Sequence, residues 1–312
     1  MKKLLIALAA LGERLRVWLI AQHWFSSILL PAIPRNLRWW LRAAYLAPID
    51  ALDRLRSDDS VAAPPRAHNF SGAAIDLQAN GAGLIAALEE VAGLTPASRV
   101  LDVGCGMGRL AIAMAGYLGP TGAYEGLDIV PDGIRWCREH VAAPYGNVHF
   151  TLSDVRNDEY NPGGSIAAVD YRFPFEDASF DVVVLVSVFT HMLPPELGHY
   201  LDEIARVLAL GGRCFATYYL LTPEARDRMA NHRSALRFKH DFGSHAVVST
   251  KMPELSVGYH DRYLDEVYAR HGLAGERYPG YWCGQPSKWS TASGTGEQDV
   301  LVARKLDVPT LV

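Results

Sequence analysis

Three glycines at alternate positions, Gly104, Gly106 and Gly108, are the residues best suited to building a ligand site in this chain. They follow a short apolar run, Val100–Val103, whose β-branched residues favour a buried strand. Glycine tolerates a tight turn and lets the backbone come close to a ligand. A carboxylate beside the turn, Asp102, would repel a pyrophosphate and attract a cation. The pattern therefore favours a ligand that carries an amino group and a sulfonium.

The glycine spacing differs from that of a dinucleotide-binding turn. In the fingerprint G-x-G-x-x-G the third glycine stands five places after the first. That place is occupied here by Arg109. The spacing therefore argues against a nicotinamide-dependent dehydrogenase.

The segment VLDVGCGMGR resembles the first motif of the class I S-adenosylmethionine-dependent methyltransferases, and in particular their type 11-like members. The resemblance continues strand after strand to about residue 220 and implies S-adenosyl-L-methionine as the cofactor. It places Asp128 at the ribose, where a carboxylate can accept hydrogen bonds from both hydroxyls, Ile129 against the adenine and Asp154 at the adenine amine. The candidate cofactor-binding residues are Asp102, Gly104, Cys105, Gly106, Gly108, Asp128, Ile129, Asp154, Val155 and Ser187.

A candidate catalytic residue follows the most apolar segment of the chain. The run FDVVVLVS, residues 180–187, is typical of a strand that is buried on both faces of a parallel sheet. Strands of open α/β sheets present ligand-contacting residues at their carboxyl ends. Thr190 and His191 are therefore expected where the methyl group is presented, with His191 as a general base or positioning group. The alternative is a helix-start residue satisfied by backbone.

Alternating strand and helix patterns predict an α/β fold with a doubly wound, mostly parallel sheet of seven strands. Helices are expected over residues 71–91, 109–118, 131–141 and 194–210. In the resembled family a helix like the first of these often covers the cofactor, which makes Phe70, Gln78 and Gly81 candidate neighbours. Probable strands at 276–281 and 299–305 resemble the antiparallel last two strands of the methyltransferase sheet.

The expected domain organisation is a helical N-terminal arm and linker at residues 1–62 and a methyltransferase domain at 63–308. Within that domain, residues 221–262 hold several histidines and basic residues among turn formers. No pair of those histidines has the spacing of a firm zinc motif, so no metal is expected. The segment is interpreted as a cap that governs substrate choice, with a solvated basic surface as the alternative.

The N-terminal arm differs in composition from the rest of the chain. Its first 45 residues hold seven basic residues against Glu13 alone and four of the seven tryptophans. Leu4, Leu8, Leu11, Leu15 and Trp18 recur at helical spacing on one face, which indicates an amphipathic helix. Three interpretations stay open: attachment to a membrane surface, packing on the body or a protein partner, and a cleaved signal peptide.

The sequence therefore predicts a methyltransferase that acts on a small molecule, including a lipid-linked or amphipathic one. The alternative is a non-catalytic, cofactor-binding subunit of a membrane or complex. With a net charge of −4 overall and +6 in the arm, the body carries −10, which argues against a nucleic-acid partner. Four scattered cysteines indicate reduced thiols and a cytoplasmic location, with or without peripheral membrane attachment. The oligomeric state is left open.

Overall fold

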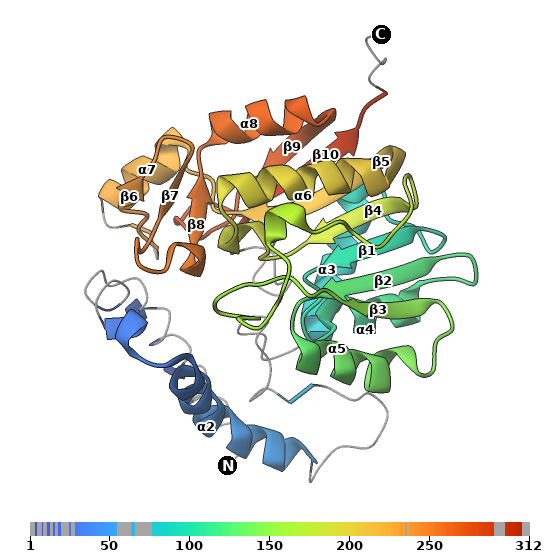
Figure 1. The fold of residues 1–312 in the computed structure, drawn as a ribbon, viewed down its shortest axis with the longest axis horizontal. Coiled ribbons are helices and arrows are strands. Elements are labelled where there is room, and N and C mark those ends of the chain that lie inside the picture. Colours follow the sequence, from blue (N-terminus) through green and yellow to red (C-terminus); the bar gives the residue numbers. More distant parts are fainter. Residues whose placement is uncertain are drawn as a thin grey trace.

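The computed structural model describes residues 29–54, 64–65, 77–231, 233–234, 236–289 and 297–307, with isolated positions before residue 29. Within these ranges seven strands form one sheet in the order β3-β2-β1-β4-β5-β10-β9 (Figure 1). The strands are β1 (Arg99–Val103), β2 (Ala123–Asp128), β3 (Val148–Leu152), β4 (Phe180–Leu185), β5 (Leu208–Tyr218), β9 (Leu273–Tyr278) and β10 (Asp299–Lys305). The doubly wound sheet predicted from the sequence is confirmed.

The strand order places a topological switch point between β1 and β4. The first five strands of the sheet pair in parallel, whereas β10 runs antiparallel to both β5 and β9. The chain leaves β1 toward β2 and later returns to β4 on the other side of β1. Ligands of such sheets bind outside the carboxyl ends of the strands at this point. The glycine turn follows β1 directly and therefore lies there.

Helices cover both faces of the sheet and bury its apolar side chains. The helices α3 (Leu77–Ala92), α4 (Arg109–Tyr117) and α5 (Pro131–Cys137) share one hydrophobic cluster with the sheet. A second cluster joins the opposite face to α6 (Pro194–Val207) and α8 (Asp261–Arg270). Continuous apolar strands such as β4 are consistent with this arrangement, because their side chains are buried on both faces.

Several element boundaries differ from the sequence-based expectation, among them those of β9, which covers Leu273–Tyr278 where a strand over 276–281 was expected. The helix expected over 194–210 ends at Val207, and β5 begins at once with Leu208, so that Gly211 and Gly212 lie inside a strand. Gly211 has a positive φ of 76°, and a Cβ on Gly212 would lie 3.0 Å from the carbonyl oxygen of Asp181. The glycines therefore serve close strand pairing rather than helix termination. The helix expected over 131–141 ends as an α-helix at Cys137 and continues as a π-helical turn, η3 (Arg138–Ala142).

The segment 221–262 forms a small substructure that the sequence did not reveal. It contains α7 (Pro223–Ala230) and a three-stranded antiparallel sheet of β6 (His240–Asp241), β7 (His245–Val247) and β8 (Val257–Tyr259). Strands of two or three residues are too short for periodicity to predict. Val247, Val257 and Tyr259 join the cluster under α6, and the Tyr259 hydroxyl donates to the carbonyl of Met192 at 2.6 Å. The small sheet is thereby fixed beside the end of β4.

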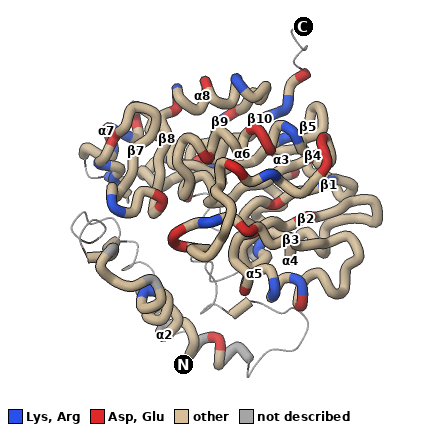
Figure 2. Tube along the Cα trace, in the orientation of Figure 1, with Lys and Arg blue, Asp and Glu red and all other residues tan. Residues whose placement is uncertain are grey.

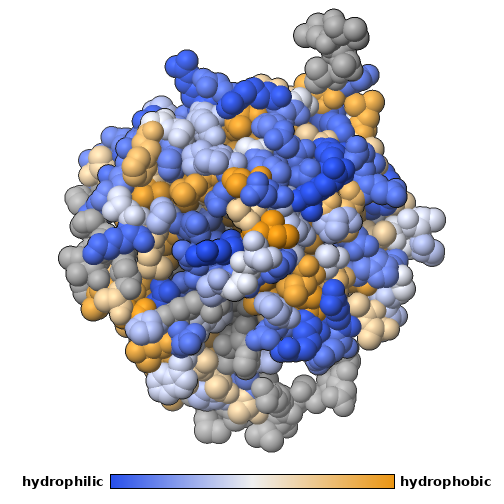
Figure 3. Space-filling view, in the orientation of Figure 1, coloured by the Kyte–Doolittle hydropathy of each residue, from blue (hydrophilic) through white to orange (hydrophobic). Residues whose placement is uncertain are grey.

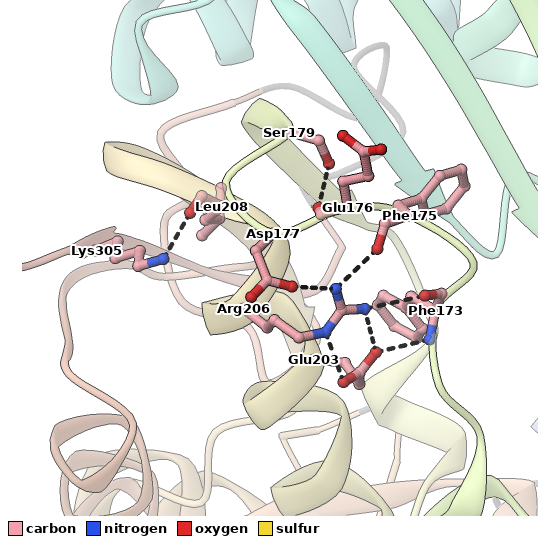
Figure 4. Close-up of polar contacts among 9 residues, drawn as sticks. All are labelled: Phe173, Phe175, Glu176, Asp177, Ser179, Glu203, Arg206, Leu208 and Lys305. Atoms are coloured by element: carbon pink, nitrogen blue, oxygen red, sulfur yellow. Dashed lines mark hydrogen bonds and ion pairs between the residues drawn. The ribbon is translucent and has the colours of Figure 1, made fainter.

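An arginine on α6 fastens the loop before β4 (Figure 4). Arg206 donates two hydrogen bonds to Glu203, at 3.0 and 2.6 Å, and one to Asp177 at 2.8 Å. It also donates to the carbonyl oxygens of Phe175 and Phe173 at 2.8 and 2.9 Å. A planar guanidinium suits this geometry because its donors form a rigid fork.

Replacing Arg206 by lysine is expected to lower the free energy of unfolding by about 1–3 kcal/mol, because lysine cannot reproduce the paired contacts and would leave partly buried acceptors unpaired. Urea denaturation measures the change. Arg262→Lys is the matched control, since Arg262 pairs with Glu266 on an exposed helix face with a side-chain exposure of 90%. Equal losses in both variants would contradict the structural role of Arg206.

The N-terminal helix α2 (Arg35–Arg54) lies outside the two helix layers, starting near the small sheet and running toward α5 (Figure 1). It follows a 3-10 turn, η2 (Leu30–Ala32), and ends at Arg54, within the range of residues 1–62 that was expected to hold the arm and linker. Leu46 and Asp50 are buried, whereas Leu37, Trp40 and Leu41 are exposed. Across the described part of the chain no helix combines the length and apolarity needed to cross a bilayer.

Candidate active site

The glycine turn after β1 has the backbone shape that its sequence predicts. Gly104, Gly106 and Gly108 all have positive φ, of 77°, 59° and 77°. A Cβ on Gly104 would lie 2.4 Å from Cγ2 of Val188, so this position excludes any side chain. The Gly104 amide donates to the carbonyl oxygen of Leu127 at 2.7 Å, which ties the turn to the end of β2. The result is a narrow, rigid bend at the switch point.

Asp128, the last residue of β2, holds the same turn from the side. Its Oδ2 accepts from the amide of Gly106 at 2.7 Å, and its Oδ1 accepts from the amide of Val130 at 2.8 Å. The residue is 7% exposed, and burial raises its pKa despite these hydrogen bonds. Each carboxylate oxygen retains a further acceptor site. Asp128 can therefore bind a diol while stabilising the bend.

Asp102 lies on β1 with its carboxyl group in a buried pocket. The residue is 4% exposed, and Oδ2 accepts from the hydroxyl of Tyr124 at 2.6 Å. Burial raises its pKa to about 6, while Tyr124 and the nearby positive charge of Arg109 oppose that rise. Arg109 is partly exposed and its positive charge lies near Asp102, so the region around Asp102 favours a bound cation only when the carboxyl group is ionised.

The third carboxylate, Asp154, follows β3 and differs from the other two. It is exposed, its side chain accepts from the hydroxyl of Ser165, and its carbonyl oxygen accepts from the amides of Ser165 and Ile166. Val155 beside it is buried, and Ile129 after β2 packs on the same hydrophobic cluster. The three acids thus belong to three adjoining strands of one sheet: Asp102 lies within β1, Asp128 ends β2 and Asp154 comes after β3.

Comparison with known proteins identifies the domain. A family model described as a methyltransferase domain matches residues 100–212, which include the glycine turn and all three acids. A 27-O-demethylrifamycin SV methyltransferase of Amycolatopsis mediterranei is 32% identical over 139 residues, which are 43% of this chain and 44% of that protein. A demethylmenaquinone methyltransferase of Bacillus cytotoxicus is 32% identical over 118 residues, 38% of this chain and 43% of that protein. Residues 100–212 of this chain therefore resemble a methyltransferase domain.

The family model covers residues 100–212 and leaves α2, α3 and the small sheet outside. The aligned segments span less than half the length of either relative. Among solved structures, the PH0226 protein of Pyrococcus horikoshii OT3 aligns with a TM-score of 0.47 at 18% identity, over 72% of this chain and 89% of that chain. The roles of the N-terminal arm and of the small sheet therefore follow only from the structure of this chain.

Ser187, the candidate at the end of β4, has a positive φ of 61°, which is uncommon for a residue with a side chain. Its amide donates to Oγ1 of Thr217 at 2.8 Å, and its hydroxyl donates to Oε1 of Gln298 at 3.0 Å. Thr217 donates to the same Gln298 oxygen at 2.5 Å. Strand β5 and the residue before β10 thus hold the chain in this conformation where β4 meets the methyltransferase site.

His191 lies in a 3-10 turn, η5 (Phe189–His191), that follows β4. Its Nδ1 is 2.9 Å from the carbonyl oxygen of Glu254, so Nδ1 carries the proton and Nε2 retains a lone pair. Burial lowers the pKa of His191, which favours the neutral ring, and the Glu254 contact opposes that shift. The ring of Tyr160 lies edge-on at 5.8 Å. The imidazole is therefore oriented and able to accept a proton.

Several residues near the methyltransferase site have no signal in the sequence. Tyr124 hydrogen-bonds to Asp102, and Gln298 hydrogen-bonds to Ser187. Glu254 contacts His191 from a segment 63 positions away. Periodicity cannot pair residues so distant along the chain. Of the candidates on the first helix, Phe70 lies outside the described residues and Gln78 falls in the first turn of α3. Gly81 lets α3 pack closely on α4, because a Cβ there would lie 2.8 Å from the carbonyl oxygen of Arg109.

The surroundings of the four cysteines and of His260 indicate structural roles. All four cysteines are buried with free thiols, and Cys105 lies inside the glycine turn, where burial raises the pKa of its thiol. His260 contacts Asp241 at 2.9 Å within the small sheet. In the described ranges, no three His, Cys, Asp or Glu residues come together as metal ligands would.

The affinity of this methyltransferase for S-adenosylmethionine is expected to fall as pH drops through about 6, because Asp102, with a pKa of about 6, then loses the charge that attracts the cofactor's ammonium group. Below that pH the loss approaches tenfold for each pH unit. Calorimetric titrations between pH 5 and 8 test this expectation. The Asp102→Asn protein should bind S-adenosylmethionine more weakly, and its affinity should not depend on pH. If the affinity of the wild-type protein does not change between pH 5 and 8, the role of Asp102 is contradicted.

Proposed function

We propose that this protein is an enzyme that transfers the methyl group of S-adenosylmethionine to a small-molecule acceptor. The observation that carries this proposal is the joint placement of Asp102, the glycine turn and Asp128 at the sheet's switch point. These residues fit the cofactor. The buried carboxylate of Asp102 suits its ammonium group, the carboxylate of Asp128 suits its ribose, and the glycine turn leaves room for its methionine part.

The cofactor supplies an electrophilic methyl group on a positively charged sulfur. Asp102, the glycine turn and Asp128 would hold the cofactor so that its methyl group could pass to a lone pair of the acceptor while the bonding electron pair stays on sulfur. The work of the chain is to hold the acceptor in line and exclude water, which is worth several kcal/mol, up to about 7–11 kcal/mol in well-oriented reactions. For a hydroxyl acceptor, Nε2 of His191 is the group placed to take the proton.

The relatives indicate the general chemical class of the acceptor. Their names describe acceptors that are small molecules, a rifamycin and a quinone precursor. The body's excess of acidic over basic residues also disfavours nucleic acid. Calorimetry with S-adenosylmethionine and S-adenosylhomocysteine tests cofactor binding, and transfer of a radioactive methyl group into cell extract tests turnover. Binding without any transfer would favour a non-catalytic subunit.

His191→Ala is expected to lower the rate of methyl transfer about tenfold without changing cofactor affinity, because the imidazole acts on the acceptor side. His199→Ala is the matched control, since His199 contacts the carbonyl of Tyr171 at 2.9 Å in the region of α6. A His191→Ala rate within about threefold of the wild-type rate would remove His191 from the mechanism.

We further propose that the N-terminal arm attaches the enzyme to an anionic membrane surface. Leu4, Leu8, Leu11, Leu15 and Trp18 are helical and between 53% and 63% exposed, so the body does not cover this apolar stripe. Basic residues of the arm complement anionic headgroups. Flotation of the full chain should succeed with anionic vesicles and fail with neutral ones at moderate salt. A stable dimer that masks the stripe and does not float would contradict attachment.

A further inference from the structure

Two segments distant in sequence meet His191 on the acceptor side of the site. One is the turn of residues 156–166 after β3, and the other is η6 (Pro253–Leu255). Asn157 Nδ2 donates to Oε2 of Glu254 at 2.7 Å, and the carbonyl oxygen of Glu254 binds His191. Tyr160 of the same turn contacts the His191 ring. These contacts enclose the imidazole from two sides.

The N-terminal helix joins this group through Arg38. Arg38 of α2 donates through Nη2 to Oε2 of Glu159 at 2.5 Å and through Nη1 to Sδ of Met252 at 3.8 Å. Its side chain is 17% exposed and that of Glu159 is 26% exposed, so solvent screens the ion pair only in part. Arg38 therefore fastens α2 to both segments that surround His191.

Two polar atoms, one on α2 and one on η5, are buried and have no hydrogen-bond partner among the described residues. They are Nε of Arg38 and the hydroxyl of Thr190, which precedes His191 in η5. A buried polar group without a partner costs about 1–3 kcal/mol. An oxygen atom of a ligand would satisfy the Arg38 donor, and a hydroxyl or carbonyl would satisfy Thr190. Both observations indicate a polar, oxygen-bearing group of the acceptor.

The opposite face of α2 is apolar and uncovered. Leu37, Trp40 and Leu41 are 45%, 65% and 49% exposed and lie on one side of the helix. Figure 2 marks the charged positions along the chain, which in α2 are Arg35, Arg38, Arg42, Asp50, Asp53 and Arg54. Figure 3 shows hydrophobic side chains at the surface around the start of this helix. A helix with one face fixed on an enzyme site and the other apolar is suited to lie in a lipid interface.

We propose that α2 is the membrane-facing wall of the acceptor site and that the acceptor is an amphipathic molecule drawn from the bilayer. Its oxygen-bearing head is held near Arg38 and Thr190, beside His191, and its apolar tail extends under α2 toward the lipid. This inference rests on the proposed methyl transfer. It adds the substrate class and assigns Arg38 two roles: its Nε faces the head of the acceptor, and its contacts with Glu159 and Met252 hold α2 in position.

The test supplies the enzyme with acceptors from two sources. Anionic vesicles of phosphatidylglycerol and phosphatidylcholine carry the total lipid extract of cells that produce the protein, and the aqueous small-molecule extract of the same cells is assayed separately. With methyl-labelled S-adenosylmethionine, we expect label in the chloroform-soluble fraction of the vesicle reaction. Label confined to water-soluble products would overturn the inference and leave the proposed methyl transfer standing. Failure to bind the cofactor, measured by calorimetry, would instead overturn the proposed function.

Surface variants separate delivery from chemistry. The double change Trp40→Ser and Leu41→Ser should lower transfer to vesicle-borne acceptor at least tenfold and leave transfer to detergent-dispersed acceptor unchanged. Leu210→Ser is the matched control, because Leu210 is 62% exposed at the start of β5, on another element. Equal rates for all three proteins on vesicles would overturn the lipid-facing role of α2.

Charge exchange tests the Arg38 contact itself. Arg38→Glu and Glu159→Arg should each lower transfer at least tenfold on vesicle-borne and on detergent-dispersed acceptor, with cofactor affinity unchanged. The double variant, which restores opposite charges, should recover at least part of that loss. Single variants with wild-type transfer, or a double variant no better than either single one, would contradict the positioning role.

Discussion

Replacing Asp128 with alanine is expected to weaken S-adenosylmethionine binding about a thousandfold. Two hydrogen bonds from a diol to a charged acceptor are together worth about 3–6 kcal/mol. The substitution also removes the acceptor for the amide of Gly106, which lies 2.7 Å from Oδ2, so the glycine turn loses a support on its ligand side. Both effects act on the same ligand, and calorimetric titration of the purified variant measures their sum.

The controls for Asp128 come from the same stretch of chain. Asp132→Ala removes a carboxylate four residues later whose side chain is 73% exposed and pairs with Arg135, and its affinity should stay within about twofold. Asp128→Asn should fall between the two, since an amide keeps one acceptor oxygen but directs N–H groups at a backbone donor. An Asp128→Ala protein that unfolds at the wild-type temperature yet binds within about tenfold would show that the ribose is held elsewhere.

Replacing Asp299 with alanine is expected to lower the free energy of unfolding by about 3–6 kcal/mol, because three buried donors would lose one acceptor. Oδ2 of Asp299 accepts from the amide of Leu220 at 2.7 Å and from Nε1 of Trp282 at 2.6 Å. Oδ1 accepts from the amide of Gly280 at 2.8 Å. The residue is 4% exposed, so water cannot replace it. Urea denaturation with linear extrapolation measures the loss.

The protonation of Asp299 gives this prediction a pH dependence. Burial raises its pKa to about 6, whereas in the unfolded chain the value is about 4, so the folded state binds the proton more tightly. The Asp299 contribution to stability therefore falls as pH rises from about 4 to about 6 and is constant above that. Asp307→Ala, at an exposed position beyond β10, should change stability by less than about 0.5 kcal/mol. A loss below about 1 kcal/mol for Asp299→Ala would show that the three donors find other acceptors.

Local sequence determined the cofactor half of this protein. The glycines at 104, 106 and 108 adopt positive φ, which glycine does at the least steric cost, and their spacing alone distinguishes the turn from a dinucleotide site. Asp102 and Asp128 lie at or near the ends of strands whose apolar runs are visible in the sequence, and parallel strands bring their carboxyl ends together. Such information lies within a few residues of each site, so pattern reading reaches it.

The acceptor half was decided only by tertiary structure. Glu254 reaches His191 from a turn beside a small sheet whose strands are two or three residues long, and Arg38 meets Glu159 across 121 positions. No periodicity encodes such pairs, because the contacts form only when the whole sheet has folded. The sequence did show an amphipathic arm but left its partner open. In the structure Arg38 of α2 binds Glu159 and Met252, while Leu37, Trp40 and Leu41 on the other side of the helix stay exposed, because one body covers only one face of a surface helix.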